Sequence, residues 1–408
     1  MGSKQDKASH IKSQSLSPRK WLKRTGLSVI ALLGMAYWPA AVDIAFPPAS
    51  AASGAQLQKQ MAKGAQLPKG YHISLYAQGL KSARLIIATS MNDLIVSSRL
   101  SKLYLVSPNQ NDKQPTGKVR TLMSGLNQPH GLLLHKGWLY IAEEHRVIRI
   151  RFDAQKKAVR GKIEIILTGM PDNGGHSTRT LKKGPDGWFY LSIGSSCNAC
   201  REQHPWRATI LRFHPDGQRS HPDGKTRPEI YATGLRNTVG FDWQPGTNRL
   251  YGVENGRDWL GDNFPPDELN LIQKGGFYGW PFRHGNNIKD PELGNSFKGS
   301  ALSSAFNFKA HVAPLSIRFL KHQKAPNMQN TALVAQHGSW NRSSKIGYRL
   351  VSLHFGKDGT ISRKMFLTGF LQGKKVIGRP VDIFEQSNGD LFISDDLTGV
   401  LWLVRYRG

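Results

Sequence analysis

The nine residues PDGWFYLSI (185–193) place a tight Asp-Gly turn directly before a short apolar strand. Five further nonapeptides have the same form, namely MNDLIVSSR (91–99), HKGWLYIAE (135–143), GTNRLYGVE (246–254), QNTALVAQH (329–337) and SNGDLFISD (387–395). Turns of this composition supply the positive φ angle that a tight connection between strands needs. The sequence is therefore built on a repeated turn-and-strand unit.

A second apolar strand follows the unit in five of its copies. These strands are SKLYLVS (101–107), HRVIRIRF (145–152), TILRFHP (209–215), IGYRLVSL (346–353) and GVLWLVRY (399–406). Six copies over about 320 residues predict an all-β fold, a six-bladed β-propeller of roughly four strands per blade. A β-sandwich is the alternative, but it does not easily produce six matched units.

The predicted propeller spans residues 67–408. Its last strand, GVLWLVRY, is expected to close the ring by pairing with LPKGYHISLYA (67–77). The spacing between copies is widest from about Glu254 to Ser316, where two Gly-rich loops occur. We expect this insert to lie on the functional face, because long loops in compact domains usually carry function.

Residues 1–52 have the composition of an export leader. A basic stretch precedes the apolar run LSVIALLGMAYW (27–38), and the small residues Ala49-Ser50-Ala51 follow. We expect a secretory signal peptide. An uncleaved signal anchor, which would associate with a membrane, is the alternative, although the run is short for a membrane span. Either way the body is expected outside the cytoplasm, in a bacterial periplasm, with residues 53–66 as a linker.

The chain is strongly basic, with a formal net charge of +28. Such a body attracts polyanions, including nucleic acid, anionic lipid or an anionic cofactor, and a general solubility charge is the plain alternative. The sequence contains no nucleic-acid-binding motif, so no nucleic-acid partner is expected.

The two cysteines, Cys197 and Cys200, stand in SSCNAC. Arg201 follows, so the haem-attachment signature C-x-x-C-H is absent, and two thiols cannot form a four-cysteine zinc site. In an oxidising compartment we expect a small local disulfide that clamps a loop. A redox-active dithiol is the alternative.

Two loop motifs could carry chemistry. NGGHSTRT (173–180) presents His176 beside two glycines, and a neutral imidazole can accept a proton near neutral pH. The alternative is a histidine that is simply hydrogen-bonded within its loop. ATGLRN (232–237) presents Arg236 and Asn237, whose donors suit carboxylate or quinone oxygens. The alternative is an arginine that ties neighbouring blades together through backbone carbonyls.

A third region, from ENGRD (254–258) through GDN (261–263) to PDELN (266–270), is rich in carboxylates, amides and glycine. This chemistry suits a hard cation such as Ca²⁺, although the spacing is not that of an EF-hand. Asx-turns and caps are the alternative. The motifs GSWNR (338–342), with Lys345, and GRPVD (378–382) add further cations. Together they suggest that Arg236, Arg342, Lys345 and Arg379 converge on a polyanion.

These motifs, in this order over about residues 67–407, resemble the sorbosone dehydrogenases. This family is related to soluble aldose and glucose dehydrogenases that use pyrroloquinoline quinone (PQQ). The resemblance is carried by NGGHSTRTLKKGPDGWFYLSIG, YATGLRNTVGFDW, VENGRDWLGDNFPPDELNLIQKGGFYGWP and GRPVDIFEQSNGDLFISDD. It implies a six-bladed propeller with PQQ and Ca²⁺ near the central axis, which oxidises a sugar hydroxyl or hydrated aldehyde by hydride transfer to the quinone.

The resemblance also implies roles for individual residues. His176 corresponds to the general base, and Arg236 with Asn237 to the pair that faces the quinone carbonyls. Gly256 and Arg257 match the loop whose backbone carbonyls hold Ca²⁺. Arg379, with Lys345 or Arg342, would bind the cofactor. Electrons would leave to a membrane quinone or a cytochrome, since the chain has no haem motif.

Three positions depart from the related glucose dehydrogenases. Ser195 stands where an aspartate orients the histidine, and Val381 stands where a second arginine follows the one matched by Arg379. Arg257 stands where the calcium loop has a proline, which places a positive charge near the expected metal. Two other functions are therefore alternatives. The first is a non-catalytic propeller that binds an anionic glycan or a protein partner, and the second, which ranks below it, is a metal-dependent lactonase.

Overall fold

The computed structural model describes residues 53–109, 116–217 and 227–408. The predicted leader, its signal or anchor character and its cleavage lie outside these residues. In the part that is described, no helix combines the length and apolar character needed to cross a membrane.

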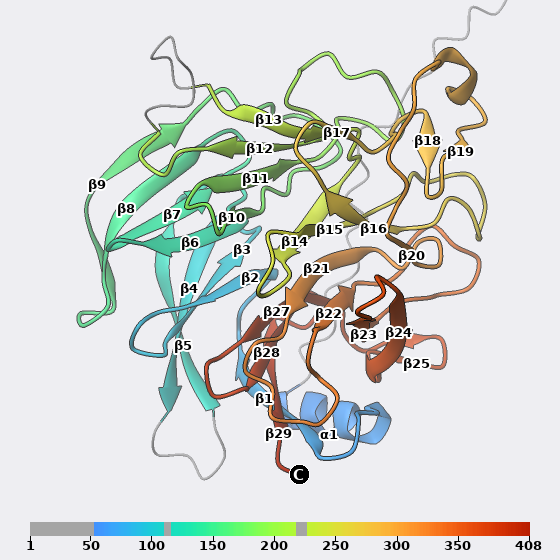
Figure 1. Cartoon of the computed structure of the whole chain (residues 1–408). Helices are drawn as coiled ribbons and strands as arrows, with labels where there is room; N and C mark the ends of the chain where they lie inside the picture. The colour runs from blue at the N-terminus through green and yellow to red at the C-terminus, as the bar shows by residue number, and fades with distance from the viewer. Residues whose placement is uncertain (1–52, 110–115, 218–226) are drawn as a thin grey trace, which may run out of the picture. The chain divides into compact units, whose positions relative to one another are not determined.

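The described residues form a six-bladed β-propeller, as predicted (Figure 1). Each blade contains four antiparallel strands, and blade 3 has a fifth, parallel strand. Blade 1 consists of β2 (Ala83–Ala88), β3 (Leu94–Ser98), β4 (Lys102–Asn109) and β5 (Thr116–Ser124). Blade 2 consists of β6 (Gly131–His135), β7 (Trp138–Ala142), β8 (Val147–Asp153) and β9 (Ala158–Leu167). Blade 3 consists of β10 (Leu181–Lys183), β11 (Phe189–Ile193), β12 (Thr209–Phe213) and β13 (Glu229–Thr233), and β17 (Gly276–Phe277) adds to it parallel to β13.

The second half of the chain forms the remaining blades. Blade 4 consists of β14 (Thr238–Trp243), β15 (Leu250–Glu254), β16 (Glu268–Ile272) and β20 (Phe306–Asn307). Blade 5 consists of β21 (Pro314–Phe319), β22 (Thr331–Gln336), β23 (Arg349–Phe355) and β24 (Ile361–Leu367). Blade 6 consists of β27 (Pro380–Glu385), β28 (Leu391–Asp395), β29 (Val400–Tyr406) and β1 (Tyr71–Gln78). Two small hairpins, β18 (Arg283–His284) with β19 (Ile288–Lys289) and β25 (Leu371–Gln372) with β26 (Lys375–Val376), and the 3₁₀ helix η1 (Gly294–Ser296) lie in the connections.

All six repeated nonapeptides end in the second strand of a blade. These strands are almost wholly buried, because each lies in a sheet that is packed on both faces against neighbouring blades. In β3, for example, Leu94 and Val96 pack toward blade 6 whereas Ile95 packs toward blade 2. Burial on both faces requires a nearly continuous apolar strand, and this is why the repeat is visible in the sequence.

The ring closes as predicted, through a strand from each end of the propeller. β1 pairs antiparallel with β29, from Tyr71 opposite Tyr406 to Gln78 opposite Val400. The predicted linker differs from the structure, because helix α1 (Gly54–Gly64) begins there with Ser53 as its N-cap. Leu57 and Met61 of α1 are buried in the core between blades 5 and 6. Two apolar residues in an eleven-residue helix give too weak a periodicity to predict it from sequence.

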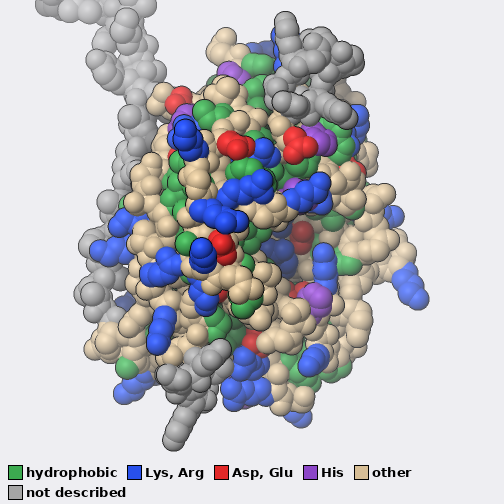
Figure 2. Space-filling model, turned by 90° about the vertical axis from the view of Figure 1, so that its left-hand side faces the viewer, with side chains coloured by type: hydrophobic (Ala, Val, Ile, Leu, Met, Phe, Trp, Pro, Cys, Tyr) green, Lys and Arg blue, Asp and Glu red, His purple; other side chains and the backbone are tan. Residues whose placement is uncertain are grey.

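The two ends of the propeller are distinguished by strand direction. The first strand of each blade begins, and the second strand ends, at what is called here the proximal end; the turns between these two strands lie at the distal end. Basic side chains are spread over the face shown in Figure 2, with few acidic ones among them, in keeping with the net charge. The same face is hollowed near its middle.

Candidate active site

The sequence motifs meet at the proximal end. His176 precedes β10, Arg236 and Asn237 precede β14, and Gly256 follows β15. Arg342 and Lys345 follow β22, and Arg379 precedes β27. The first strands line the axis, so loops that enter them bring residues from different blades together.

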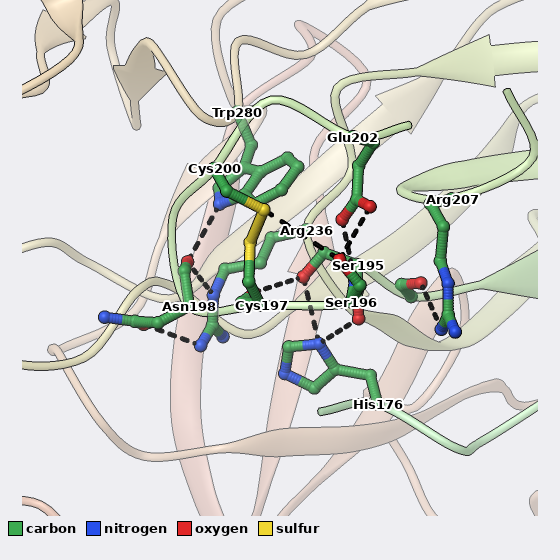
Figure 3. The surroundings of a disulfide bond; sticks show 11 residues. His176, Ser195, Ser196, Cys197, Asn198, Cys200, Glu202, Arg207, Arg236 and Trp280 are labelled. Carbon is green, nitrogen blue, oxygen red and sulfur yellow. Dashed lines mark hydrogen bonds between the residues drawn. A yellow bond between two sulfur atoms is a disulfide. The ribbon is translucent and has the colours of Figure 1, made fainter. Parts of the chain in front are cut away.

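His176 is held in one orientation by Ser195, as Figure 3 shows. Its Nδ1 lies 2.9 Å from the carbonyl oxygen of Ser195 and 3.0 Å from the Ser195 Oγ. That hydroxyl donates its own hydrogen to the carbonyl of Cys197 at 2.7 Å. Because a carbonyl can only accept, Nδ1 must carry the imidazole hydrogen, and Nε2 keeps the lone pair. Among the described residues Nε2 has no hydrogen-bond partner.

The charge state of His176 is set by its surroundings. Burial, together with the positive charges of Arg236, Arg207 and Arg179, lowers its pKa from 6.5 to about 3. The backbone acceptor at Ser195 acts in the opposite direction. His176 is therefore a neutral imidazole throughout the physiological pH range, with Nε2 able to accept a proton.

Asn237 lies beside His176, and Gly194, which has no side chain, lets the two residues lie close together. A Cβ atom on Gly194 would come within 2.6 Å of the His176 Cβ and 2.9 Å of the Asn237 Oδ1. Glycine is thus required between the two side chains. The Asn237 backbone is fixed by the carboxyl of Glu254, which accepts from its N–H at 2.5 Å. Its side-chain amide has no hydrogen-bond partner among the described residues, so a donor and an acceptor are available next to His176.

Arg236 does not have the free guanidinium that the resemblance implied. It is buried, and its donors reach the backbone oxygens of Asn198, Asn255 and Gly256 at 2.8–3.1 Å. They also reach the Asn198 Oδ1 and the Asp258 carboxylate. The side chain therefore ties three loops together, which is the blade-linking alternative considered from the sequence. Its charge still acts on His176.

The predicted calcium loop is likewise occupied by this guanidinium. The Gly256 carbonyl accepts from Arg236 at 2.8 Å, so a cation already lies against it. The Arg257 side chain turns away to form an ion pair with the buried Asp290 at 2.6 Å and a second one with Glu292. A divalent cation at the Gly256 carbonyl would face the charge of Arg236, so Ca²⁺ does not fit at that carbonyl in this arrangement.

The nearby carboxylates also act structurally. Asp267 accepts from the backbone N–H groups of Gly256 and Ala313, both at 2.8 Å, and burial raises its pKa to about 7. Burial raises the pKa of Glu254 to about 8. Among the described residues, the one group of three metal-binding side chains within reach of each other is Cys197, Cys200 and Glu202. Both of these cysteines are oxidised. In the acidic insert, Glu254 and Asp267 accept from backbone N–H groups, which matches the alternative of turns and caps.

The predicted local disulfide is present between Cys197 and Cys200 (Figure 3). It clamps the loop that carries Asn198, a residue that no sequence motif singled out. Asn198 accepts from Arg236, from the Asp258 backbone N–H at 2.7 Å and from the Trp280 indole at 3.1 Å. The disulfide loop thus positions the Arg236 cluster.

The remaining cations lie on neighbouring loops. Arg379 is buried and donates to the carbonyl of Gly338 at 3.1 Å. Arg342 donates to the carbonyl of Asp262, whereas Lys345 is exposed. Val381, at the position where an arginine was expected, is buried with Val239 and Leu315 in a small apolar cluster of three first strands. An arginine there would be an unpaired buried charge.

The family model for glucose / sorbosone dehydrogenases matches residues 139–365, which is more than half of the chain. The chain belongs to the glucose/sorbosone dehydrogenase family. An uncharacterised protein of Borreliella burgdorferi is 29% identical over 361 residues, covering 84% of this chain and 91% of that protein. The match to the family model confirms the family resemblance drawn from the motifs.

Solved structures share the fold of this family member. A calcium structure of a Trichoderma reesei enzyme of carbohydrate-active family AA12 superposes with a TM-score of 0.72 at 23% identity, covering 84% of this chain and 97% of that one. The holo form of the PQQ domain of a pyranose dehydrogenase from Coprinopsis cinerea gives 0.68 at 20% identity, covering 84% and 97%.

A further group that the motifs did not reveal lies on the same end of this dehydrogenase-family propeller. The Nε2 of His337 is 2.9 Å from the Asp396 carboxylate, which also pairs with Arg84 at 2.9 Å. Burial and the charge of Arg379 lower the pKa of His337 to about 4. No sequence motif marks this triad, because its members come from three distant segments.

Two tryptophans stand at the rim of the site. Trp259 and Trp340 are 67% and 45% exposed, and their rings meet edge to face with centroids 5.3 Å apart. They sit on the loops of Asp258 and Arg342, directly beside residues of the Arg236 cluster. Exposed indoles at a site rim offer flat apolar faces to a ligand.

Proposed function

We propose that this protein is a PQQ-dependent dehydrogenase that oxidises a hydroxyl or hydrated aldehyde group of a sugar. The single observation that carries the proposal is the orientation of His176. Ser195 fixes the hydrogen on Nδ1, so Nε2 is the basic atom, and it is directed away from the residues that hold the ring (Figure 3). This is the geometry that a general base for a substrate hydroxyl needs.

The electric field at the proximal end favours an anionic cofactor. The charges of Arg236, Arg207 and Arg179 lower the pKa of His176, and those of Arg84 and Arg379 lower the pKa of His337. Such concentrated positive charge suits the three carboxylates of PQQ. Arg379, Arg342 and Lys345 would hold these carboxylates, and the Asn237 amide would donate to a cofactor oxygen beside His176.

PQQ, when bound, would supply the acceptor for a hydride, which carries the two electrons of the oxidation. His176 then takes the hydroxyl proton of the substrate at Nε2. An imidazolium forms on that histidine, and nearby arginines disfavour it. An anionic cofactor bound close to His176 would offset the charge of these arginines and raise the pKa of His176, so cofactor binding would strengthen the base. The Ser195 carbonyl would remain its acceptor at Nδ1.

The family and the structural neighbours support the sugar substrate. The matching family model is that of glucose and sorbosone dehydrogenases, and the Coprinopsis neighbour is a PQQ domain of a pyranose dehydrogenase. Trp259 and Trp340 would offer a stacking surface to a sugar ring. Calcium has no role in this proposal, because the Gly256 carbonyl is taken by Arg236. Secretion to the periplasm and transfer of electrons to a membrane quinone or cytochrome complete the proposal.

The test is reduction of an artificial electron-accepting dye by the purified protein with added PQQ and a panel of aldoses. We expect substrate-dependent reduction that falls at least 100-fold in His176→Gln, which keeps the size of the side chain but loses the base. His354→Gln, a histidine of blade 5 on a strand away from the site, is the matched control. Reduction that is equal in wild type and His176→Gln would overturn the assignment of the base.

A further inference from the structure

The distal end of the propeller contains a cavity of about 580 Å³ that the proposed chemistry does not use. It is lined by the turn between β10 and β11 and by the distal parts of the first strands β2, β6, β14, β21 and β27. The His176 and Arg236 loops lie at the opposite ends of these strands. The cavity is therefore separate from the candidate active site, and its volume is in the range of small-molecule sites.

The two carboxylates in the lining are already engaged by the protein. Asp382 accepts from the Ile86 backbone N–H at 2.9 Å and from the Ser316 hydroxyl at 2.7 Å. Asp242 accepts from the Phe319 N–H at 3.0 Å and pairs with Lys182 at 3.3 Å. These contacts link neighbouring blades. The acidic groups thus have structural partners within the propeller.

Three cationic side chains of the lining, unlike its carboxylates, keep donors without a hydrogen-bond partner in the described chain. Arg318 is fixed by its Nε, which donates to the carbonyl of Ile383 at 3.0 Å. Its two terminal nitrogens have no hydrogen-bond or ion-pair partner among the described residues. The ammonium groups of Lys183 and Lys321, both exposed, also lack such a partner within the described chain. A held guanidinium with two open nitrogens is a preorganised receptor for an oxyanion.

The rest of the lining is largely apolar. Trp243, Leu133 and Phe384 are half-buried and face the cavity together with Ile87 and Leu132. Trp243 is held by an edge-to-face contact with Tyr190 at 5.0 Å. A free sugar, with hydroxyls all around its ring, would leave many of them unpaired against such walls. A molecule with one anionic end and an apolar body would place its anion against the cations and its body against the apolar walls.

We propose that this cavity binds a small organic acid. Its carboxylate is bound by the terminal nitrogens of Arg318, with Lys183 and Lys321 at the mouth. Its apolar body, a ring or short branched chain, lies against Trp243, Leu133 and Phe384. Because the site lies at the distal end, its ligand does not compete with a sugar or a cofactor at His176.

The test is isothermal titration calorimetry of the purified full chain with benzoate, benzyl alcohol and inorganic phosphate as probes. We expect saturable benzoate binding at one site per chain, and no measurable binding of the other two. In Arg318→Met the benzoate affinity falls at least tenfold, whereas Arg407→Met, which removes an exposed arginine elsewhere, leaves it unchanged. Lys321→Met, at an exposed position, weakens binding about threefold and guards against misfolding of the Arg318 variant.

Three results would overturn the proposal. Phosphate that binds as tightly as benzoate would show a plain anion site. Benzyl alcohol that binds as tightly would show an apolar pocket without need of the cations. Benzoate affinity that is unchanged in both Arg318→Met and Lys321→Met would place the acid elsewhere on this basic protein.

Discussion

The Nδ1 atom of His176 and the backbone carbonyl oxygen of Ser195 lie 2.9 Å apart. This contact fixes the imidazole tautomer without a negative charge. An aspartate at position 195 would add one, stabilise the imidazolium and raise the pKa of His176 from about 3.

We therefore predict a shift in the pH dependence of kcat/KM in Ser195→Asp. The base works only when neutral, so activity is lost as the pH falls through the pKa of His176. Wild type should be insensitive to this group between pH 5 and 8, whereas the acidic limb of Ser195→Asp should move to higher pH. Ser195→Asn, of the same size but uncharged, is the control. Identical acidic limbs in the two variants would contradict the assignment.

Arg236 is predicted to hold the loops of the site in place. Its buried guanidinium holds the loops of Asn198, Gly256 and Asp258, and a lysine cannot reproduce this set of hydrogen bonds. We expect Arg236→Lys to lower the free energy of unfolding by about 3 kcal/mol in urea denaturation. The exposed Arg407→Lys should change it by less than about 0.5 kcal/mol. Equal stabilities would show that the contacts of Arg236 do not hold the site together.

Helix α1 is predicted to be part of the folded domain. Met61 is fully buried between blades 5 and 6, so Met61→Ala should lower the free energy of unfolding by about 3 kcal/mol. Lys63→Ala, on the exposed side of the same helix, serves as the control. If both variants match wild type, residues 53–66 behave as the linker that the sequence suggested.

His337 is predicted to make the fold acid-sensitive. Its pKa is lowered to about 4 in the folded protein, against an ordinary value of 6.5. As the pH falls below 6.5, the unfolded chain binds a proton that the folded chain does not, so stability is lost. The loss from this group is about 2 kcal/mol between pH 7 and pH 5.

Chemical denaturation of wild type and His337→Gln at the two pH values measures this contribution. Glutamine does not titrate, so the variant should lose less stability on acidification than wild type. The same loss in both proteins would show that His337 is not held neutral in the fold.

The fold could be predicted because the second strand of every blade is buried on both faces. A strand such as Leu94–Ser98 must then begin with consecutive apolar residues, here Leu94–Val96, and the turn before it must contain Gly or Asn. The pairing of β1 with β29 was expected from the way propellers join their two ends, since β1 itself is only partly buried. Positions such as Leu57 in α1 were not, since a helix that buries two residues leaves little periodicity.

The sequence predicted which residues form the candidate site better than it predicted the role of each residue. Single-sequence motifs located His176, Asn237 and Arg236 on loops that do meet. They could not show that the Arg236 guanidinium is hydrogen-bonded to Asn198 and Asp258, because these partners lie 38 and 22 residues away along the chain. Which acceptor a guanidinium reaches depends on how the loops fold, and the residue type alone does not encode it.

The most direct test of the account is an equilibrium titration of the purified protein with PQQ, followed by the absorbance of the cofactor. We predict saturable binding of one PQQ per chain that is at least tenfold weaker in Arg379→Met and unchanged in Arg318→Met, at the distal cavity. No saturable binding, or binding lost in Arg318→Met instead, would contradict a cofactor site at the proximal end.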